Sequence, residues 1–164
     1  GAPPDRVKGH DMAGSDLVSV LGGIDLFHGL PPKVLGQIAD RGHEAEYAPG
    51  TVVIVQGDSV EGFKAFAPGG AEMHVVLDGT ARVDVHGQTH AVLEPGAYFG
   101  EISLIDGRPR SADVVAGEGG LRTLALSKWT FEDLLEKHPE IAVPMLRVLA
   151  ARLRADEEPR SDAE

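Results

Sequence analysis

One stretch of the sequence, residues 98–115, concentrates side chains that suit an anionic ligand. It reads YFGEISLIDGRPRSADVV, with Gly100 and Glu101 near its start and Arg110 and Ser111 near its end. A glycine lets a ligand approach the backbone, and the fork of an arginine can bond two oxygens of one phosphate. Glu101 would repel a phosphate, but a carboxylate readily accepts a hydrogen bond from a sugar hydroxyl. A phosphate and a sugar hydroxyl together suggest a nucleotide.

The overall charge makes this stretch a local exception. The chain has 26 acidic and 15 basic side chains, a formal net charge of −11. Such a surface repels a phosphate backbone, so we expect no nucleic-acid partner. An anionic ligand must therefore be held by a local site, and we expect Arg110 to neutralise it.

The composition also excludes several other classes of protein. The chain has no cysteine, so it can hold neither a disulfide nor a cysteine-bound metal. It contains no run of about 18 apolar residues, and its N-terminus lacks the basic-then-apolar order of a secretory signal. We therefore expect a cytoplasmic protein with no membrane contact. Its 164 residues suit a single domain.

The N-terminal part of the sequence predicts two short amphipathic helices. The first begins after Ser15 as N-cap and stops at the glycine pair 22–23. The second lies within residues 30–42, with prolines where a helix can begin and Gly42 as its stop. Residues 1–14 are expected to be a disordered or artificial segment outside the domain.

Residues 43–127 have a different character, because short β-rich runs alternate with glycine-rich turns. The runs are residues 51–55, 73–77, 81–85 and 89–93, with a further strand in the stretch SADVVA. No helical pattern interrupts them to suggest parallel βαβ units. The sequence thus predicts a mainly β protein with flanking helices, built on an antiparallel β-roll of the jelly-roll type (a double-stranded β-helix).

The C-terminal part predicts helices again, over residues 128–138 and 139–154. The second carries apolar residues at 142, 146, 149 and 153, which share one helical face. In the first, four residues at helical spacing are expected to be core: Trp129, Phe131, Leu134 and Leu135. The predicted domain is 15–155, followed by a disordered acidic tail at 156–164.

The stretch around the two charged residues also resembles a known family. Phe99-Gly100-Glu101-Ile102-Ser103-Leu104, followed by Arg110-Ser111-Ala112, is similar to the phosphate-binding cassette of cyclic-nucleotide-binding domains. The resemblance covers residues 21–153, with supporting matches in LFHGLPPKVLGQIA, VIVQGD, VVLDGTARV and FEDLLEKHPEIAVPMLRVLAARL.

This resemblance implies a role for each cassette residue. Arg110 would hold the cyclic phosphate, and Glu101 would hold the ribose 2′-hydroxyl. The other implied ligand contacts are the backbone at Gly100, Ile102 and Ala112, the Ser111 hydroxyl at the phosphate, and Val83 in the wall around sugar and base. Leu104 would move with the cassette and the last helices when the pocket closes. Arg108 matches a variable turn position and is expected to be a solvated charge.

The implied function is that of a sensor rather than an enzyme. A cyclic nucleotide would shift the cassette and the C-terminal helices between two arrangements. The signal would pass to a separate effector protein, with the sensor a monomer or a weak dimer. Ser111 favours cyclic AMP over cyclic GMP, because threonine at this position accompanies cyclic GMP in the family. No cofactor other than this ligand is expected.

Two departures from the family pattern bear on the site. Residues 63–71 form an insertion, which we expect to be an inert surface loop that can be removed with little loss of affinity. A role for Phe63 or Phe66 as a lid is a weaker alternative. No aromatic residue follows Phe131, so aliphatic side chains or one of three arginines, Arg147, Arg152 or Arg154, would have to cover the base.

Two other functions remain open. The protein could be an interaction module that keeps the fold with little nucleotide affinity. It could also be a cupin-like metal protein, since residues 68–96 have similar glycine-punctuated strands. The candidate metal ligands are then His74, His86 and His90, but they lack the His-x-His spacing that such a site needs.

Overall fold

In the computed structural model, residues 14–61 and 67–157 are described. The helices are α1 (Gly14–Gly22), η1 (Asp25–Phe27), α2 (Pro32–Arg41), α3 (Glu101–Asp106), α4 (Lys128–Lys137), η2 (Pro139–Ile141) and α5 (Ala142–Glu157). The strands are β1 (His43–Tyr47), β2 (Val52–Ile54), β3 (Glu72–Val85), β4 (Gln88–Leu93), β5 (Tyr98–Phe99) and β6 (Asp113–Ser127). The predicted mainly β fold with flanking helices is confirmed.

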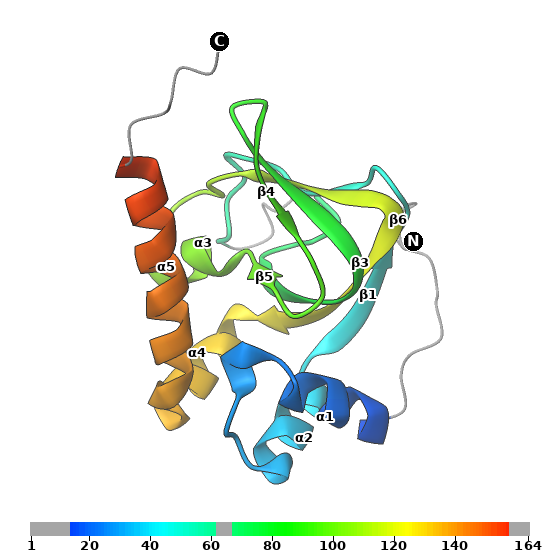
Figure 1. Ribbon diagram of the computed structural model, residues 1–164, viewed down its shortest axis with the longest axis vertical. Helices are drawn as coiled ribbons and strands as arrows, with labels where there is room; N and C mark the ends of the chain where they lie inside the picture. The colour runs from blue at the N-terminus through cyan, green and yellow to red at the C-terminus, as the bar shows by residue number, and fades with distance from the viewer. Residues whose placement is uncertain (1–13, 62–66, 158–164) are drawn as a thin grey trace.

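The six strands form one antiparallel sheet that curls into an open roll (Figure 1). The path runs β1-β6-β3-β4, with β2 also paired to β6 and β5 also paired to β3. The sheet is not closed. The long strands β3 and β6 pair along most of their length, from Glu72 opposite Ser127 to Asp84 opposite Asp113. They therefore hold the other four strands together.

Strands β3 and β6 are both longer than the runs that the sequence predicted. Residues 73–77 and 81–85 were expected to be separate strands, but β3 runs through both. Its register shifts between Gly79 and Ala81, where Gly79 adopts a φ of +77°. The glycine thus makes an irregularity inside one strand rather than a turn between two. Strand β1 was not predicted as a run of its own.

The helices pack at one end and along one side of the roll (Figure 1). α1 and α2 lie together below the sheet, and α5 runs alongside the roll next to α3. Helix α1 begins at Gly14, so Ser15 lies inside its first turn instead of preceding it. The described part of α5 extends to Glu157, two residues past the expected domain end, and residues 158–164 lie outside the described range.

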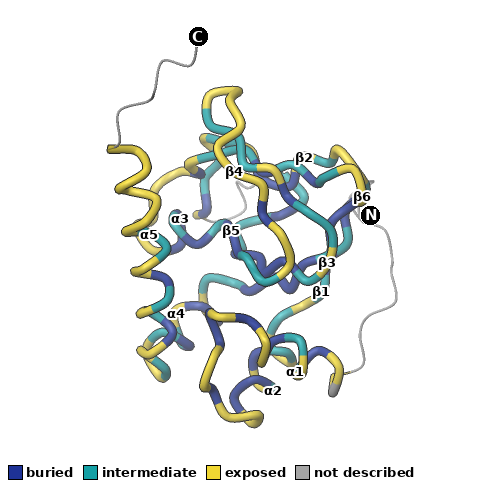
Figure 2. Tube along the Cα trace, in the orientation of Figure 1, coloured by how far each residue is buried: buried dark blue, intermediate teal, exposed yellow. Residues whose placement is uncertain are grey.

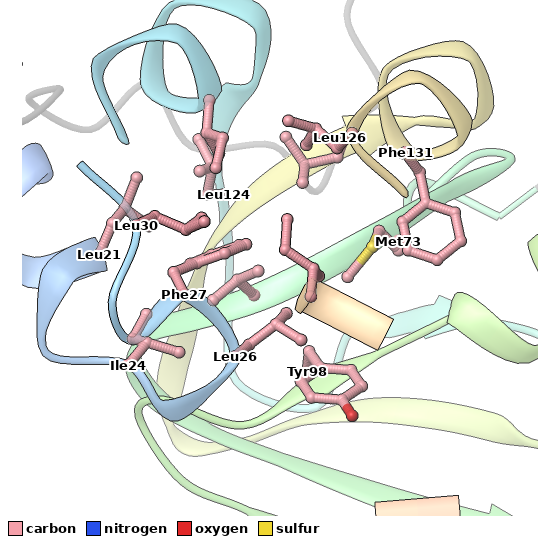
Figure 3. Packing of buried hydrophobic residues seen from close by; sticks show 14 of the residues in the cluster. Leu21, Ile24, Leu26, Phe27, Leu30, Met73, Tyr98, Leu124, Leu126 and Phe131 are labelled. Atoms are coloured by element: carbon pink, nitrogen blue, oxygen red, sulfur yellow. The ribbon is translucent and has the colours of Figure 1, made fainter. Parts of the chain in front are cut away.

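The buried side chains form two clusters. One lies between the roll and the helices and includes Phe27, Met73, Leu126 and Phe131 (Figure 3). The other fills the roll itself, with residues such as Val53 and Val76. The N- and C-terminal helices therefore share one core with the outer face of the sheet.

One core prediction in the C-terminal helices was wrong, and the predicted apolar face of the last helix is only partly covered. Phe131 and Leu134 are buried and Leu135 is partly buried, but Trp129 is 81% exposed. In α5 the buried residue is Met145, whereas Leu146 and Leu153 from the expected apolar face are exposed. Figure 2 shows that α5 is mostly exposed toward its C-terminal end. No described helix is both long and apolar enough to cross a membrane.

Candidate functional site

A cavity of about 510 Å³ lies between the interior of the roll, α3 and the C-terminal half of α5. It is where the structure brings the predicted ligand-binding residues together. Seven of them line it, namely Val83, Gly100, Glu101, Ile102, Arg110, Ser111 and Ala112. Arg108 is exposed and is not among the lining residues, as expected for a solvated charge.

Gly100 is required by the backbone geometry where β5 ends and α3 begins. Its φ of +86° lies in the left-handed region, which side chains disfavour. A Cβ at this position would also stand 2.9 Å from the Glu72 carbonyl oxygen and 3.2 Å from Nη1 of Arg110. The glycine therefore turns the chain sharply and lets the Arg110 side chain lie against the backbone.

Arg110 is 4% exposed, and described backbone and side-chain oxygens hold its guanidinium. Nη1 donates to the Gly100 carbonyl at 2.7 Å and to the Ser103 hydroxyl at 3.2 Å. Nη2 donates to the carbonyls of Gly70 at 2.9 Å and Glu72 at 2.7 Å. Burial lowers the pKa of Arg110, but an arginine stays charged at neutral pH. The cavity wall thus contains a fixed, buried cation.

Glu101 is 1% exposed and does not pair with Arg110 in the described structure. Its Oε1 accepts a hydrogen bond from Nη1 of Arg152 in α5 at 3.2 Å. Burial raises the pKa of Glu101, and a hydrogen bond from its own backbone N–H and the charges of Arg152 and Arg110 oppose that rise. In the described structure Glu101 therefore pairs with a residue of α5 and not with the arginine of its own cassette.

The comparison with known families agrees with this geometry. The sequence profile described as "Cyclic nucleotide-binding domain" matches residues 44–138, more than half of the chain. The chain belongs to the cyclic nucleotide-binding domain family.

Individual relatives support the same assignment. The domain is 36% identical to a cAMP-dependent protein kinase regulatory subunit from Blastocladiella emersonii, over 68% of this chain and 26% of that one. It is 34% identical to the cyclic AMP receptor protein of Thermus thermophilus, over 80% of this chain and 58% of the relative. The crystal structure of the Thermus thermophilus catabolite activator protein superposes with a TM-score of 0.66 at 32% identity, covering 80% of this chain and 59% of that one. The domain thus spans from a quarter to just over half of these relatives.

Leu104, the predicted moving residue, lies outside the cavity. It is 3% exposed and belongs to the cluster between the roll and the helices, which also contains Ile141 and Met145. The cyclic nucleotide-binding domain therefore connects α3 to the C-terminal helices through a shared apolar core. A displacement of α3 would disturb that core.

The sequence did not predict which residues outside the cassette would line the cavity. Beyond the cassette the cavity is lined by Leu149, Arg152, Leu153, Ala155 and Asp156 of α5, and by His90 of β4. Arg152 was one of three arginines considered from the sequence, and the structure selects it over Arg147 and Arg154, which do not line the cavity. The helical period predicts which residues share a face, but not which part of the roll that face meets.

The end of the insertion is not inert. Residues 62–66, which include Phe63 and Phe66, lie outside the described range. Gly69, however, donates from its backbone N–H to the Val53 carbonyl at 2.8 Å, and the carbonyl of Gly70 accepts from Arg110. These contacts argue against an inert role for this end of the insertion, because Gly70 supplies one acceptor of the buried cation; the effect of removing residues 63–71 stays a prediction.

His74, a metal candidate in the cupin alternative, is fully buried and hydrogen-bonded within the protein. Its Nε2 lies 3.0 Å from the Gly69 carbonyl, which can only accept, so Nε2 carries the proton. Its Nδ1 lies 2.8 Å from the Thr123 hydroxyl and is the acceptor of that bond. Burial lowers the pKa of His74 to about 4. In the described ranges, no group of three or more His, Cys, Asp or Glu could hold a metal ion.

Proposed function

We propose that this domain is a cyclic AMP sensor whose ligand lies in the cavity between the roll and α5. One observation carries the proposal. Arg110 and Glu101 are both almost completely buried, yet both line the same cavity, which Gly100 also lines. A buried cation and a buried carboxylate on one wall suit a ligand that presents an anion and a hydroxyl together.

The phosphate is assigned to Arg110 and its neighbours. Four bonds from Nη1 and Nη2 fix the guanidinium, and no acceptor for Nε is described among residues 14–61 and 67–157. Nε is thus the guanidinium donor that we expect to bond a phosphate oxygen. The Ser111 hydroxyl and the backbone at Gly100, Ile102 and Ala112 would supply the remaining contacts.

The ribose is assigned to Glu101. A carboxylate has about four sites that can accept a hydrogen bond, and Arg152 occupies one of them. The 2′-hydroxyl would take another. Val83 of β3 lines the same cavity and would form part of the wall around sugar and base.

The base would lie against α5, where Leu149 and Leu153 provide an apolar cover in place of an aromatic one. Ser111 favours adenine, since threonine at its position accompanies guanine in the family. Cyclic GMP is a second candidate because Asp156 also lines the cavity. A carboxylate could accept from the N–H groups of guanine or from the amino group of adenine.

The response to the ligand is assigned to Leu104 and the C-terminal helices. Leu104 shares a core with Met145 of α5, so α3 and α5 can change position together. A change in α5 would then be read by a separate effector protein, with the domain acting as a monomer or a weak dimer. The reported relatives are a kinase regulatory subunit and a receptor protein, which agrees with a regulatory rather than a catalytic role.

Calorimetric titration tests this proposal directly. Cyclic AMP and cyclic GMP would be added to the protein, with linear 5′-AMP as the control that lacks the cyclic phosphate. We expect saturable binding of cyclic AMP and much weaker binding of 5′-AMP. If neither cyclic nucleotide binds at millimolar concentration, the domain is instead an interaction module that only retains the fold.

A further inference from the structure

We infer that His74 is a positioning residue for Arg110, because its ring holds the glycine pair 69–70, which carries one acceptor of the guanidinium. His74 is not among the described residues that line the cavity, so any effect on a ligand must pass through Arg110. The part of the inference that concerns ligand affinity rests on the proposed function and deepens it. It adds a residue of β3 on which the contact to the phosphate depends.

The glycine pair needs contacts from outside to keep its shape. Neither glycine has a side chain to restrict its backbone, and Gly70 adopts a φ of +59°. The pair precedes β3, which begins at Glu72, so the ladder of the sheet does not hold it. The carbonyl of Gly70 nevertheless accepts from Nη2 of Arg110 at 2.9 Å. The direction of this carbonyl is therefore set by the contacts that fix the peptide groups beside it.

The sheet holds the peptide groups on both sides of Gly69. The N–H of Gly69 donates to the Val53 carbonyl of β2 at 2.8 Å, and its carbonyl accepts from Nε2 of His74 at 3.0 Å. The second bond fixes the plane of the peptide that joins Gly69 to Gly70. The Gly70 N–H in that plane donates to the Ala67 carbonyl at 3.0 Å, but this bond lies within the turn itself. The bond from His74 is thus what ties this plane to the sheet.

The ring of His74 is itself held in place. It is completely buried, and its Nδ1 accepts from the Thr123 hydroxyl at 2.8 Å. It stacks on Phe99, with ring centroids 5.0 Å apart and an interplanar angle of 11°. Phe99 directly precedes Gly100, whose carbonyl is another acceptor of Arg110. The ring therefore contacts both segments that supply carbonyl acceptors to the guanidinium.

An alternative is that His74 only fills the core. An apolar ring could make the same stack on Phe99, and it would avoid the cost of burying polar atoms. It could not, however, donate a hydrogen bond to the carbonyl of Gly69. The stack belongs to the face of the ring and the positioning bond to Nε2, so substitutions can separate the two roles.

The ion pair of Glu72 does not replace this contact. Its carboxylate oxygens lie 2.9 Å from Nε2 of His43 in β1, and both side chains are partly open to solvent. Glu72 is already paired with Ser127 in the sheet. The ion pair therefore strengthens the start of β3, whereas the glycine pair before it depends on His74.

Three variants separate packing from positioning. His74→Phe keeps a ring that can stack but removes the donor to Gly69. His74→Gln loses the ring, but its side-chain amide can still donate to that carbonyl. Thr123→Val is the matched control, because Thr123 is as buried as His74 and the change removes the bond to Nδ1 while it leaves the bond from Nε2.

The first test needs no nucleotide. Nitrogen-15 NMR would record the guanidinium of Arg110, with Arg110→Lys used to assign its signals. We expect separate signals for the two Nη groups in the native protein, because their hydrogen bonds slow rotation of the guanidinium. The signals should merge in His74→Phe and stay separate in His74→Gln and Thr123→Val. Signals that stay separate in His74→Phe, or that are already merged in the native protein, would overturn the inference.

The second test measures the affinity for cyclic AMP by calorimetry and the stability by thermal denaturation. His74→Phe should weaken binding by about three- to tenfold, which is the usual effect of one lost hydrogen bond. His74→Gln and Thr123→Val should stay within about twofold of the native affinity, although both lose stability. Losses of affinity that simply follow the losses of stability would show that His74 is only a core residue. Failure of the native protein to bind cyclic AMP would refute the proposed function, while the NMR test still decides whether His74 positions Arg110.

Discussion

Arg110 donates from Nη1 to the carbonyl of Gly100, 2.7 Å away, so the two ends of the cassette are bonded to each other in the described structure. The bond spans ten residues and encloses all of α3. Contacts within the protein thus fix the position of the cation, which reduces the entropy that ligand binding would otherwise cost. It also means that Arg110 has a structural role besides the proposed one.

Because of that double role, the first prediction uses a conservative change. Arg110→Lys keeps the charge but loses the planar fork, and we expect the affinity for cyclic AMP to fall by roughly ten- to a hundredfold. Arg110→Ala would leave four acceptors, one of them buried and three part-buried, without their donor and would also destabilise the fold. Affinity is measured by calorimetry, and folding is checked by thermal denaturation.

Arg108→Ala is the control for this prediction. Arg108 is exposed, and the described contact at this position is made by its backbone N–H, which donates to Asp106 at 2.9 Å. The substitution should leave the affinity within about twofold, since surface charges away from a site have small effects. Equal losses in the two variants would show that the assignment of the phosphate to Arg110 is wrong.

A second prediction compares two glycine substitutions. Gly69→Ala would place a Cβ 2.5 Å from the Val53 carbonyl oxygen, so the backbone must shift, and we expect a loss of about 1–3 kcal/mol in the free energy of unfolding. Gly36→Ala, inside α2, meets nothing within 4 Å and should stabilise by about 0.5–1 kcal/mol. Denaturant unfolding measures both.

The same pair of variants reports on the insertion. Gly69 precedes Gly70, whose carbonyl accepts from Arg110. Gly69→Ala should therefore also weaken cyclic AMP binding, while Gly36→Ala should not. Unchanged affinity and stability in Gly69→Ala would restore the original expectation that residues 63–71 form an inert loop.

The cassette could be predicted from the sequence because its information is local. Gly100, Glu101 and Arg110 lie within eleven consecutive residues, and each residue type restricts what that short segment can do. The glycine, the carboxylate and the arginine after a proline suggested a site for an anion and a hydroxyl, and the resemblance to the phosphate-binding cassette implied the role of each residue. The number and type of turns likewise indicated a β-roll.

The partners of these residues could not be predicted, since they come from remote segments. Arg152 meets Glu101 only because α5 runs along the roll, and two of the four acceptors of Arg110, the carbonyls of Gly70 and Glu72, lie 40 and 38 residues earlier in the chain. Trp129 fits the helical period of a core residue but lies on an exposed part of α4. Periodicity predicts a face, whereas burial depends on which other element covers that face.

A third prediction concerns the buried His74. Its pKa is lowered from 6.5 to about 4 in the folded protein, since burial disfavours the charged ring. The unfolded chain therefore binds a proton between these values while the native state does not. Stability from this residue is fully present above pH 6.5 and is lost as the pH falls toward 4. The expected loss between pH 7.5 and pH 5 is about 2 kcal/mol.

Denaturant unfolding at several pH values would measure this slope, with His74→Gln as the comparison. The variant should be less stable at pH 7.5 but should lose less stability on acidification. The raised pKa of Glu101 acts in the opposite direction, so the difference between the two proteins is the informative quantity. An NMR signal of the His74 ring that titrates near pH 6.5 in the folded protein would contradict the prediction.

The last prediction is the identity of the base, and it contrasts two cavity residues. The Ser111 hydroxyl can serve the phosphate of either ligand, whereas the Asp156 carboxylate lines the cavity from α5, against which the proposed function places the base. With adenine as the ligand, Ser111→Ala should have a mild effect, and cyclic AMP should bind more tightly than cyclic GMP. With guanine, Asp156→Ala should weaken binding of cyclic GMP by about tenfold and leave cyclic AMP almost unchanged, because two N–H donors of guanine then lose their carboxylate acceptor at once. Side-by-side calorimetry of both ligands on the native protein and the two variants decides between them. The choice of cyclic AMP would be overturned if the native protein bound cyclic GMP more tightly than cyclic AMP and if either variant lost that preference.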